Sequence, residues 1–523
     1  MTAATAAPAR TRGPRAARVV PAGTVRLLRI ELRRNAMPLV LPLIAVLFWF
    51  DSYRPSTAMP AEFVLRTFWN MGQGHTIVDS GPFVAGLAAW MGSRDGRRHL
   101  ADLAVTAARP RWTAQLVTWT ATAIWAVGGY LVLTGAMFVV YGVQHVHGEP
   151  PYWWVVVGAV AVAAFSAAGF AVGAFFPSRF AAPVAAFGAF LAMMMSSQTG
   201  FSHTSGWAWL LPTNSNGNFQ PDSGLLYPYL PDLPIARIML LAGLGLACLG
   251  LFGLPAAAGG ARLRITAAAI TVAGLAATGT AVGLVSSAHL GPHGVVIPAL
   301  HDAANDRPTA YTPVCGRADG VPACVNPAYR SDLAGVTTAL TPLVREWSGL
   351  PGAPARVTQI PAIYDPGEGQ AGQAMTPRGQ PSVLGIPLGA LGLPGAFGWT
   401  GTEVSRQLRL LAAHAFVGAG AGVGTPAQQA VEAALLQHAG VPIAEQPQLR
   451  TSIGLPSWAR PGTDLAHGPG PATGPVYAAA RRLAALPPGA RHAWLAAHLA
   501  ALRSGRLTLS QLTLSQLTQA QRP

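Results

Sequence analysis

The chain has 523 residues, of which 51% are hydrophobic and only 11% are charged. This composition excludes a wholly soluble set of domains, because the first half of the chain cannot cover itself with a solvated surface. The net charge is +15 and every basic residue is arginine. A P-loop ATPase is excluded as well, since that motif needs a lysine to reach the nucleotide phosphates.

The first predicted element is a basic amphipathic helix over residues 24–34, in front of the first apolar span. Its pattern places it at the cytoplasmic membrane interface. Apolar residues recur at helical spacing on one side and arginines on the other: Val25, Leu28 and Leu32 against Arg26, Arg29 and Arg33.

Seven apolar segments follow, each a candidate for a membrane-spanning helix of roughly 20 residues. They are Ala36–Phe50, Asp79–Gly92, Trp112–Val143, Tyr152–Phe176, Ala181–Gly200, Pro234–Leu254 and Ile265–Ser287. The second is short, and it either crosses the membrane or forms a re-entrant half-helix.

Arginine alternates between the connections of these segments and predicts their orientation. Arginines are dense before the first segment, in the 93–111 loop and in the short connections after the fourth and sixth segments. The other connections hold only Arg54 and Arg66, and Arg237 lies at the edge of the sixth segment. The arginine-rich side is therefore predicted to be cytoplasmic, which makes the chain a multi-pass plasma-membrane protein with a cytoplasmic N-terminus and residues 288–523 outside.

The loop over residues 93–112 carries the most specific local pattern. It begins with alternating acidic and basic residues, continues through a short leucine-containing stretch and ends at Arg109-Pro110-Arg111. It resembles the cytoplasmic loop of type-2 ABC exporter permeases, and the resemblance covers roughly residues 24–256. The seventh segment and the external region are additions to that family's six-span core.

The resemblance implies a coupling helix over His99–Ala108 that docks on a separate ATPase subunit. The implied apolar contacts are Leu100, Leu103 and Val105, and the polar ones are Arg94, Asp95, Arg97, Arg98 and Asp102. It also implies a homodimer or a pair with a similar permease, with ATP and magnesium bound by the partner ATPase. The alternative is a solvated, positively charged loop without a partner.

The connection over residues 201–233 is rich in aromatic residues, which favour the membrane interface. In the resembled family this connection often dips back into the membrane, so its aromatic residues are candidates for an exit gate: Trp207, Trp209, Tyr227 and Tyr229. An ordinary interfacial belt is the alternative.

Residues 288–523 lose the long apolar runs and gain proline and glycine, which predicts an α+β domain. Strand-like runs lie at Gly294–Ile297, Arg356–Ile360 and Ser382–Ile386, and helical patterns at Arg330–Trp347, Thr402–Val417, Thr425–His438, Val476–Ala485, Ala490–Arg503 and Thr508–Gln519. Cys315 and Cys324 are nine positions apart, and on the external side they can oxidise to a disulfide. Half of a metal site is the alternative for this pair.

The predicted fold is an α-helical polytopic membrane protein of about seven spans with a C-terminal extracytoplasmic α+β domain. Its parts are a cytoplasmic tail and interfacial helix (1–35), a six-span core (36–256), a seventh span (257–287) and the external domain (288–523). The predicted function is the permease subunit of an ATP-driven exporter of an unidentified substrate, without catalytic, cofactor or metal sites of its own. A drug, an antibiotic peptide and a lipid are all open as substrates, and a neutral path favours an amphipathic one. A membrane-anchored sensor, or a degenerate peptidase-like domain without transport activity, is the alternative.

Overall fold

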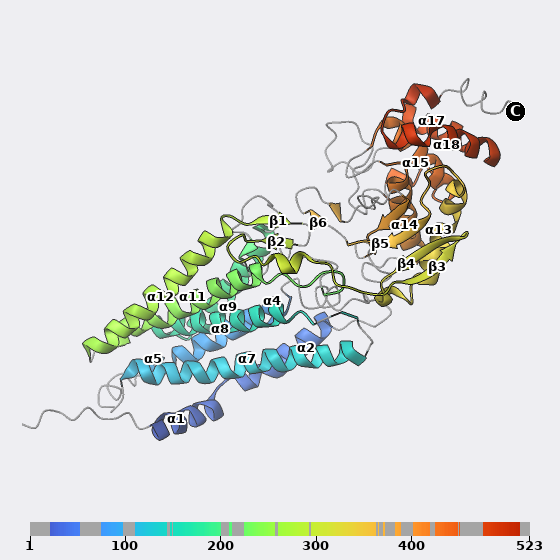
Figure 1. The fold of residues 1–523 in the computed structure, drawn as a ribbon. Helices are drawn as coiled ribbons and strands as arrows, with labels where there is room; N and C mark the ends of the chain where they lie inside the picture. The colour runs from blue at the N-terminus through green and yellow to red at the C-terminus, as the bar shows by residue number, and fades with distance from the viewer. Residues whose placement is uncertain are drawn as a thin grey trace, which may run out of the picture.

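The computed structural model describes residues 21–52, 75–97, 110–143, 147–148, 150–199, 209–211, 224–256, 260–291, 294–361, 364–365, 370–371, 382–388, 401–418, 424–447, 449 and 474–512. An elongated bundle of apolar helices makes up the N-terminal half, and a mixed domain sits at one end of it (Figure 1). The short helix α1 lies at the opposite end of the bundle, far from that domain.

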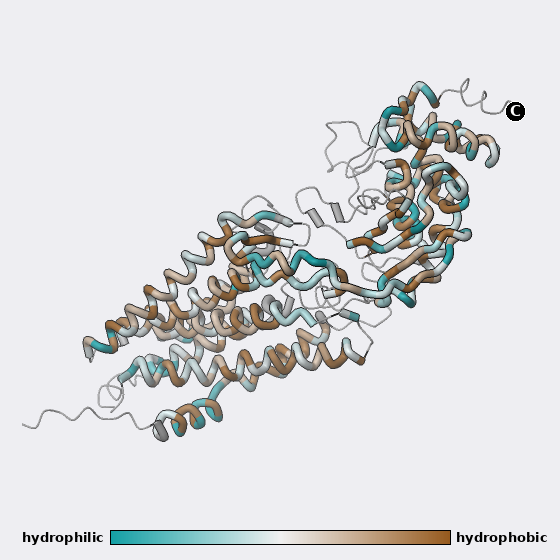
Figure 2. The backbone as a smooth tube through the Cα atoms, viewed as in Figure 1, coloured by the Kyte–Doolittle hydropathy of each residue, from teal (hydrophilic) through white to brown (hydrophobic). Residues whose placement is uncertain are grey.

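Every apolar segment predicted from the sequence contains a helix. The bundle is built from α2 (Met37–Ser52), α4 (His75–Gly92), α7 (Arg111–Val143), α8 (Tyr152–Phe175), α9 (Ala181–Thr199), α11 (Asp232–Ala256) and α12 (Ala261–Val285). The helix predicted to begin at Asp79 begins four residues earlier, at His75. In Figure 2 these helices carry long hydrophobic stretches.

Four of these helices are long and apolar enough to cross a membrane, namely α7, α8, α11 and α12. A fifth span is possible by length and composition if α1 (Pro21–Arg34) and α2 count as one, although their axes differ by 52°. Among the described residues, α9 contains a shorter apolar helix, Ala181–Met195. The chain is therefore a membrane protein, and its described residues contain four or five helices of spanning length.

The helices of the bundle approach one another through small residues. A Cβ atom on Gly169 or Gly173 of α8 would collide with the carbonyl oxygen of Ala85 or Ala89 of α4. Helices α11 and α12 approach equally closely at a glycine, because a Cβ on Gly243 would lie 2.6 Å from the carbonyl oxygen of Gly274. Small residues spaced four apart let helix backbones pack closely in lipid, where apolar burial gives little driving force.

The C-terminal domain contains a four-stranded sheet in the order β3-β4-β5-β8. Its strands are β3 (Val314–Ala318), β4 (Val321–Val325), β5 (Arg356–Gln359) and β8 (Val383–Ile386); β3 pairs antiparallel with β4, and the other pairs are parallel. The helices are α13 (Leu333–Trp347), α14 (Gly401–Phe416), α15 (Pro426–His438), α17 (Pro475–Ala484) and α18 (Pro488–Arg503). The predicted mixture of helices and strands in this region is confirmed.

Shorter elements complete the C-terminal half. Two small sheets pair β1 (His289–Gly291) with β2 (Gly294–Val296) and β6 (Tyr364–Asp365) with β7 (Gln370–Ala371). Three 3-10 turns are η4 (Ala303–Asp306), η5 (Pro327–Tyr329) and η8 (Leu509–Leu512). The helix predicted over Thr508–Gln519 is thus a single 3-10 turn as far as the structure describes it.

The β3–β4 hairpin was not predicted, although its turn is visible in the sequence. Asp319 and Gly320 connect the strands and both have positive φ, at 47° and 86°. Positive φ at both central residues is the requirement of a type I′ hairpin turn, and Asp-Gly is a favoured sequence for it. Cys315 and Cys324 face each other across this hairpin.

Near the predicted boundary at 288, each half of the chain contributes residues to the packed core of the other. Val295 and Ile297 pack with Leu233 and Val285 at the end of α11 and α12, so β2 belongs with the bundle. Conversely, Leu225 and Leu226, which precede α11, are part of the domain core. The bundle and the domain are therefore interleaved at their contact.

Candidate functional site

The predicted ATPase-coupling residues are only partly within the described chain. Arg94, Asp95 and Arg97 lie in the single-turn helix α5 (Arg94–Arg97), which follows α4 directly. The predicted coupling helix His99–Ala108 lies outside the described residues, and with it Arg98, Leu100, Asp102, Leu103 and Val105. The candidate site is therefore the base of this loop and the elements that hold it.

Arg94 holds the base of the loop against α1. Its two terminal nitrogens donate to the two carboxylate oxygens of Glu31, at 3.0 and 2.9 Å. Both side chains are mostly buried, and Asp95 lies 3.6 Å from the Arg94 Nε atom. The Glu31 carboxylate raises the pKa of Arg94 further above its ordinary value. A bidentate pair of this kind fixes orientation as well as distance.

Arg97 secures the other end of the same turn. Its guanidinium stacks 3.5 Å from the centroid of the Trp90 ring and donates to the Trp90 carbonyl oxygen. Its Nε also donates to Ser93 Oγ at 3.1 Å, and Ser93 Oγ in turn donates to the Trp90 carbonyl. The first turn of the loop is thus tied to the last turn of α4, so the two move together.

Helix α1 is in turn fixed to α7. The indole nitrogen of Trp125 donates to the carbonyl oxygen of Leu32 at 2.9 Å. Asn35 donates from its side-chain amide to Thr122 Oγ1 at 2.9 Å, and its side-chain oxygen accepts from the Met37 backbone nitrogen at the start of α2. We call the set Glu31, Leu32, Asn35, Arg94, Thr122 and Trp125 the α1–α4 junction.

The α1–α4 junction joins three helices that are distant in sequence. A force applied to α5 reaches α4 through the chain, α1 through Arg94 and α7 through the bonds of α1. Sequence reasoning predicted Arg94 as a partner-facing residue but missed Glu31, Asn35 and Trp125. The one available signal was that Glu31 is the single acidic residue of the basic helix.

The sides of α1 differ in burial. Leu28 and Leu32 are half-buried, together with Leu27 and the buried Glu31. Val25 is 61% exposed. On a 3.6-residue repeat Val25 falls at the edge between the leucines and the arginines.

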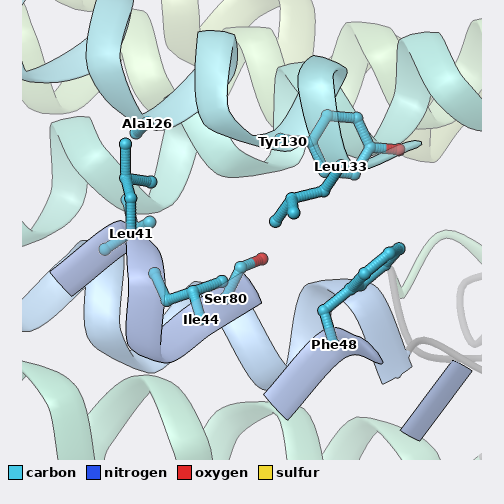
Figure 3. A pocket seen from close by; sticks show the side chains of 8 residues that line it. Leu41, Ile44, Phe48, Ser80, Ala126, Tyr130 and Leu133 are labelled. Atoms are coloured by element: carbon cyan, nitrogen blue, oxygen red, sulfur yellow. The ribbon is translucent and has the colours of Figure 1, made fainter. Parts of the chain in front are cut away.

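A small apolar pocket lies between α2, α4 and α7 (Figure 3). The hydroxyl groups of Ser80 and Tyr130 are its polar groups, and no charged side chain lines it. The apolar lining residues are Leu41, Ile44, Phe48, Val84, Ala126 and Leu133.

The aromatic residues of the predicted exit gate contact two different regions. Trp209 is buried among α11, α12 and β2, and its carbonyl oxygen accepts from Arg237 Nε at 2.7 Å. Tyr227 packs on the core of the C-terminal domain, and Tyr229 lies against Gly224, whose φ is +79°. Trp207 lies outside the described residues.

A histidine between two carboxylates lies where the bundle meets the C-terminal domain, a contact that we call the outer junction. Asp232, at the start of α11, is fully buried and its Oδ2 accepts from the backbone nitrogen of Ile297 and contacts His301 Nδ1 at 3.1 Å. The other ring nitrogen of His301 lies 3.1 Å from Asp306 Oδ2. Asp306 and Asp232 together raise the pKa of His301, the hydrogen bond to Asp306 being the largest cause.

The C-terminal domain contains the predicted disulfide and a buried histidine pair. Cys315 and Cys324 are bonded, with their Cα atoms 4.0 Å apart. His414 on α14 lies 2.9 Å from Glu432 on α15, and both side chains are fully buried. Among the described residues no group of three or more His, Cys, Asp or Glu is arranged to hold a metal ion.

Comparison with known proteins adds no relative to this description. No protein-family model, no curated protein and no solved structure matches the chain.

Proposed function

We propose that the chain is the membrane-spanning permease subunit of an ATP-driven exporter of the type-2 ABC class. In this proposal the seven apolar helices all cross the membrane, the N-terminus and the 93–111 loop are cytoplasmic, and the C-terminal domain is outside. The observation that carries it is the α1–α4 junction. An interfacial helix and the base of a basic loop are locked together by the bidentate Arg94–Glu31 pair, where a partner would push.

The mechanical argument starts from α4. This helix contacts α2, α7, α8 and α9, so its displacement changes most of the bundle. Because α5 is tied to Trp90 and Ser93 at the end of α4, a load on the loop is transmitted to α4 without a flexible step. ATP hydrolysis in a separate ATPase subunit would supply that load, since this chain has no lysine for a P-loop.

The path proposed for the substrate is uncharged. Asp232 and Arg237 lie at one end of α11, and no charged side chain lines the α2–α4–α7 pocket. Ion-coupled carriers use ionisable residues inside the membrane. An uncharged route driven from a cytoplasmic loop fits an amphipathic substrate moved by an external energy source.

The proposal is tested by capturing the partner through the loop. A photo-crosslinking amino acid at Leu103 in the full-length protein should crosslink to an ABC ATPase subunit of the source organism, identified by mass spectrometry. The same substitution at Thr402 of α14, an exposed position in the C-terminal domain, is the control. If deletion of residues 99–108 leaves both ATPase binding and ATP-driven export intact, the proposal is wrong.

A second candidate function is favoured by the outer junction. Leu225 and Leu226 lie in the domain core, and the Thr309 backbone nitrogen donates to the Leu226 carbonyl at 2.8 Å. A ligand that changes the domain would therefore act on the segment leading into α11. A sensor without transport predicts ligand binding by the domain and no ATPase partner, which the same crosslinking experiment distinguishes.

A further inference from the structure

The exposed side of α1 carries positive charge that no acidic residue of the same helix offsets. Four arginines and two aliphatic residues form one continuous exposed surface along the helix, which we call the arginine face: Val25, Arg26, Arg29, Ile30, Arg33 and Arg34. The aliphatic members are substantially exposed, Val25 at 61% and Ile30 at 40%.

The acidic residue of α1 does not offset these arginines. Glu31 is turned to the inner side of the helix, where both of its carboxylate oxygens accept from Arg94. Its charge is thus already matched by a residue from another helix. The arginine face is left as four positive charges over three helical turns, with no carboxylate of α1 among them.

The connection between α1 and α2 keeps the arginine face at the edge of the apolar bundle. Only Asn35 and Ala36 separate the two helices, and Asn35 is buried and bonded to Thr122 and to the start of α2. Immediately beyond this bend, Leu39 of α2 is 81% exposed. The arginine-rich helix α1 and the apolar helix α2 are therefore only a few residues apart, and their axes differ by 52°.

We propose that the arginine face binds the headgroups of anionic phospholipids. Guanidinium groups bind phosphate oxygens in a bidentate manner, and clustered basic residues next to a membrane helix are attracted to anionic lipid. Val25 and Ile30 beside the arginines fit the boundary between headgroups and acyl chains, where both kinds of side chain are satisfied. The acidic surface of a partner protein would leave these aliphatic side chains without apolar contacts.

The inference rests on the membrane placement in the proposed function, and it is independent of transport. It adds a consequence for the α1–α4 junction, because Glu31 joins the lipid-binding helix to the base of the 93–111 loop. Anionic lipid would then hold one side of the loop base in a fixed position relative to the bilayer surface.

The test measures lipid selectivity of the purified full-length protein without ATP or any ATPase. The protein is equilibrated in mixed micelles with equimolar phosphatidylglycerol and phosphatidylcholine, repurified, and its retained lipids are quantified by mass spectrometry. We expect wild-type protein to retain phosphatidylglycerol in roughly tenfold preference, as expected for several basic residues at a membrane surface. The variant R26Q/R29Q/R33Q/R34Q should reduce the preference to about twofold or less.

Matched variants separate specific binding from net charge. The variant R307Q/R330Q/R356Q/R506Q removes the same charge from exposed arginines of the C-terminal half and should keep the wild-type preference. Four Arg-to-Lys changes on α1 should give an intermediate value, because charge is kept and bidentate geometry is lost. The pairwise variants R26Q/R29Q and R33Q/R34Q serve if the fourfold variant does not fold.

The result that overturns the inference is a preference near one in wild-type protein, or an unchanged preference in the α1 variants. A fourfold variant that keeps lipid selectivity but loses binding of an ATPase would assign the arginine face to a protein partner instead. Because no transport is measured, failure here leaves the export proposal standing, and failure of the crosslinking experiment leaves this result unaffected.

Discussion

The helical bundle and the C-terminal domain are packed differently. In the bundle, glycine and alanine allow backbones to touch, and the large side chains are divided between buried positions, such as Phe170 and Phe252, and outward ones, such as Leu39. In the domain, large side chains fill the centre: Trp347 and Trp494 are almost completely buried, and Trp347 stacks on Phe416 with ring centroids 4.7 Å apart. The difference follows from the solvent, since lipid gives little reward for burying leucine and water gives much.

The two regions also differ in the kind of buried polar contact that they contain. The domain buries a charged pair, in which Arg491 donates to both carboxylate oxygens of Glu346 at 2.7 and 2.8 Å. Inside the bundle the recurring polar contact is a threonine hydroxyl bonded to a carbonyl of its own helix, as at Thr122 and Thr271. The bundle should therefore be sensitive to added volume, and the domain to lost volume and lost partners.

The largest expected effect is overpacking of the bundle at Gly173. Gly173→Val places a Cβ against the Ala89 carbonyl oxygen, which is backbone and cannot move aside. We expect loss of the folded monodisperse protein in detergent, measured by fluorescence-detected size exclusion. Gly188→Val in α9 is the control, because a Cβ there meets nothing within 4 Å. Equal loss from both variants would contradict close packing of α4 on α8.

The converse test removes volume from the domain. Trp347→Ala leaves a cavity beside Phe416 and should lower the free energy of unfolding by about 3–5 kcal/mol. Differential scanning calorimetry of the full chain should show the domain transition moving while that of the bundle stays in place. Arg345→Ala, an exposed position on the same helix, should change neither transition. Coupled movement of both transitions would show that the two regions unfold together.

The disulfide gives an intermediate effect confined to the domain. Replacing Cys315 and Cys324 together by alanine removes the disulfide between two residues that are nine positions apart. This should lower the free energy of unfolding of the domain by about 2–3 kcal/mol, because the unfolded chain is no longer constrained. The measurement is the temperature of the domain unfolding transition with and without reductant. Reductant should lower this temperature in wild-type protein and leave it unchanged in the double alanine variant. Cys248→Ala, within α11, removes the free cysteine and should leave the reductant effect unchanged.

Local patterns in the sequence were sufficient for most helices of both regions, although the helix predicted over Thr508–Gln519 is a 3-10 turn where it is described. The predicted span Trp112–Val143 matches α7 to within one residue, because a long apolar run bounded by arginine leaves few other starting points. The domain helices were equally visible, as at Thr425, which caps α15 together with Gln428. The β3–β4 hairpin could have been found from Asp319-Gly320, and close helix packing from Gly169 and Gly173.

Contacts between distant segments could not be read in this way. Glu31 and Arg94 are 63 residues apart, and no local periodicity relates them. Helical spacing has the same limit at Val25, since it predicts that a helix has two faces but not which neighbour each face meets. The same holds for Asp232 and His301, which come together only because β2 returns onto the end of α11.

A smaller effect is expected at the α1–α4 junction, which is partly exposed. Glu31→Gln removes one charge of the Arg94 pair and should cost on the order of 1–2 kcal/mol. Limited trypsin digestion should then cut at Arg33 and Arg34 faster than in wild-type protein, because α1 is released from α5. Exchanging the two residues, as Glu31→Arg with Arg94→Glu, should restore protection. Unchanged cleavage in E31Q would show that α1 is held by Trp125 and Asn35 alone.

The smallest effect is the pH dependence of the outer junction, where bundle and domain meet. Contact of both His301 ring nitrogens with carboxylates is satisfied by the imidazolium form, and the carboxylates raise the pKa of His301. A raised pKa in the folded state means that the stabilisation is complete below the unfolded value of about 6.5 and is lost as pH rises through the folded value.

This pH dependence is measured by following the melting temperature of wild-type protein from pH 5 upwards and comparing its slope with that of His301→Gln. Wild-type protein should lose stability as the pH rises above about 6.5, and the glutamine variant should show less of this loss, because glutamine donates one bond at any pH. The effect should be modest, since Asp306 is half exposed and water competes for its bond. Since Asp232 begins α11 and Asp306 belongs to the C-terminal half, identical slopes in the two proteins would mean that the two regions are joined by packing at Leu225 and Leu226 rather than by charge.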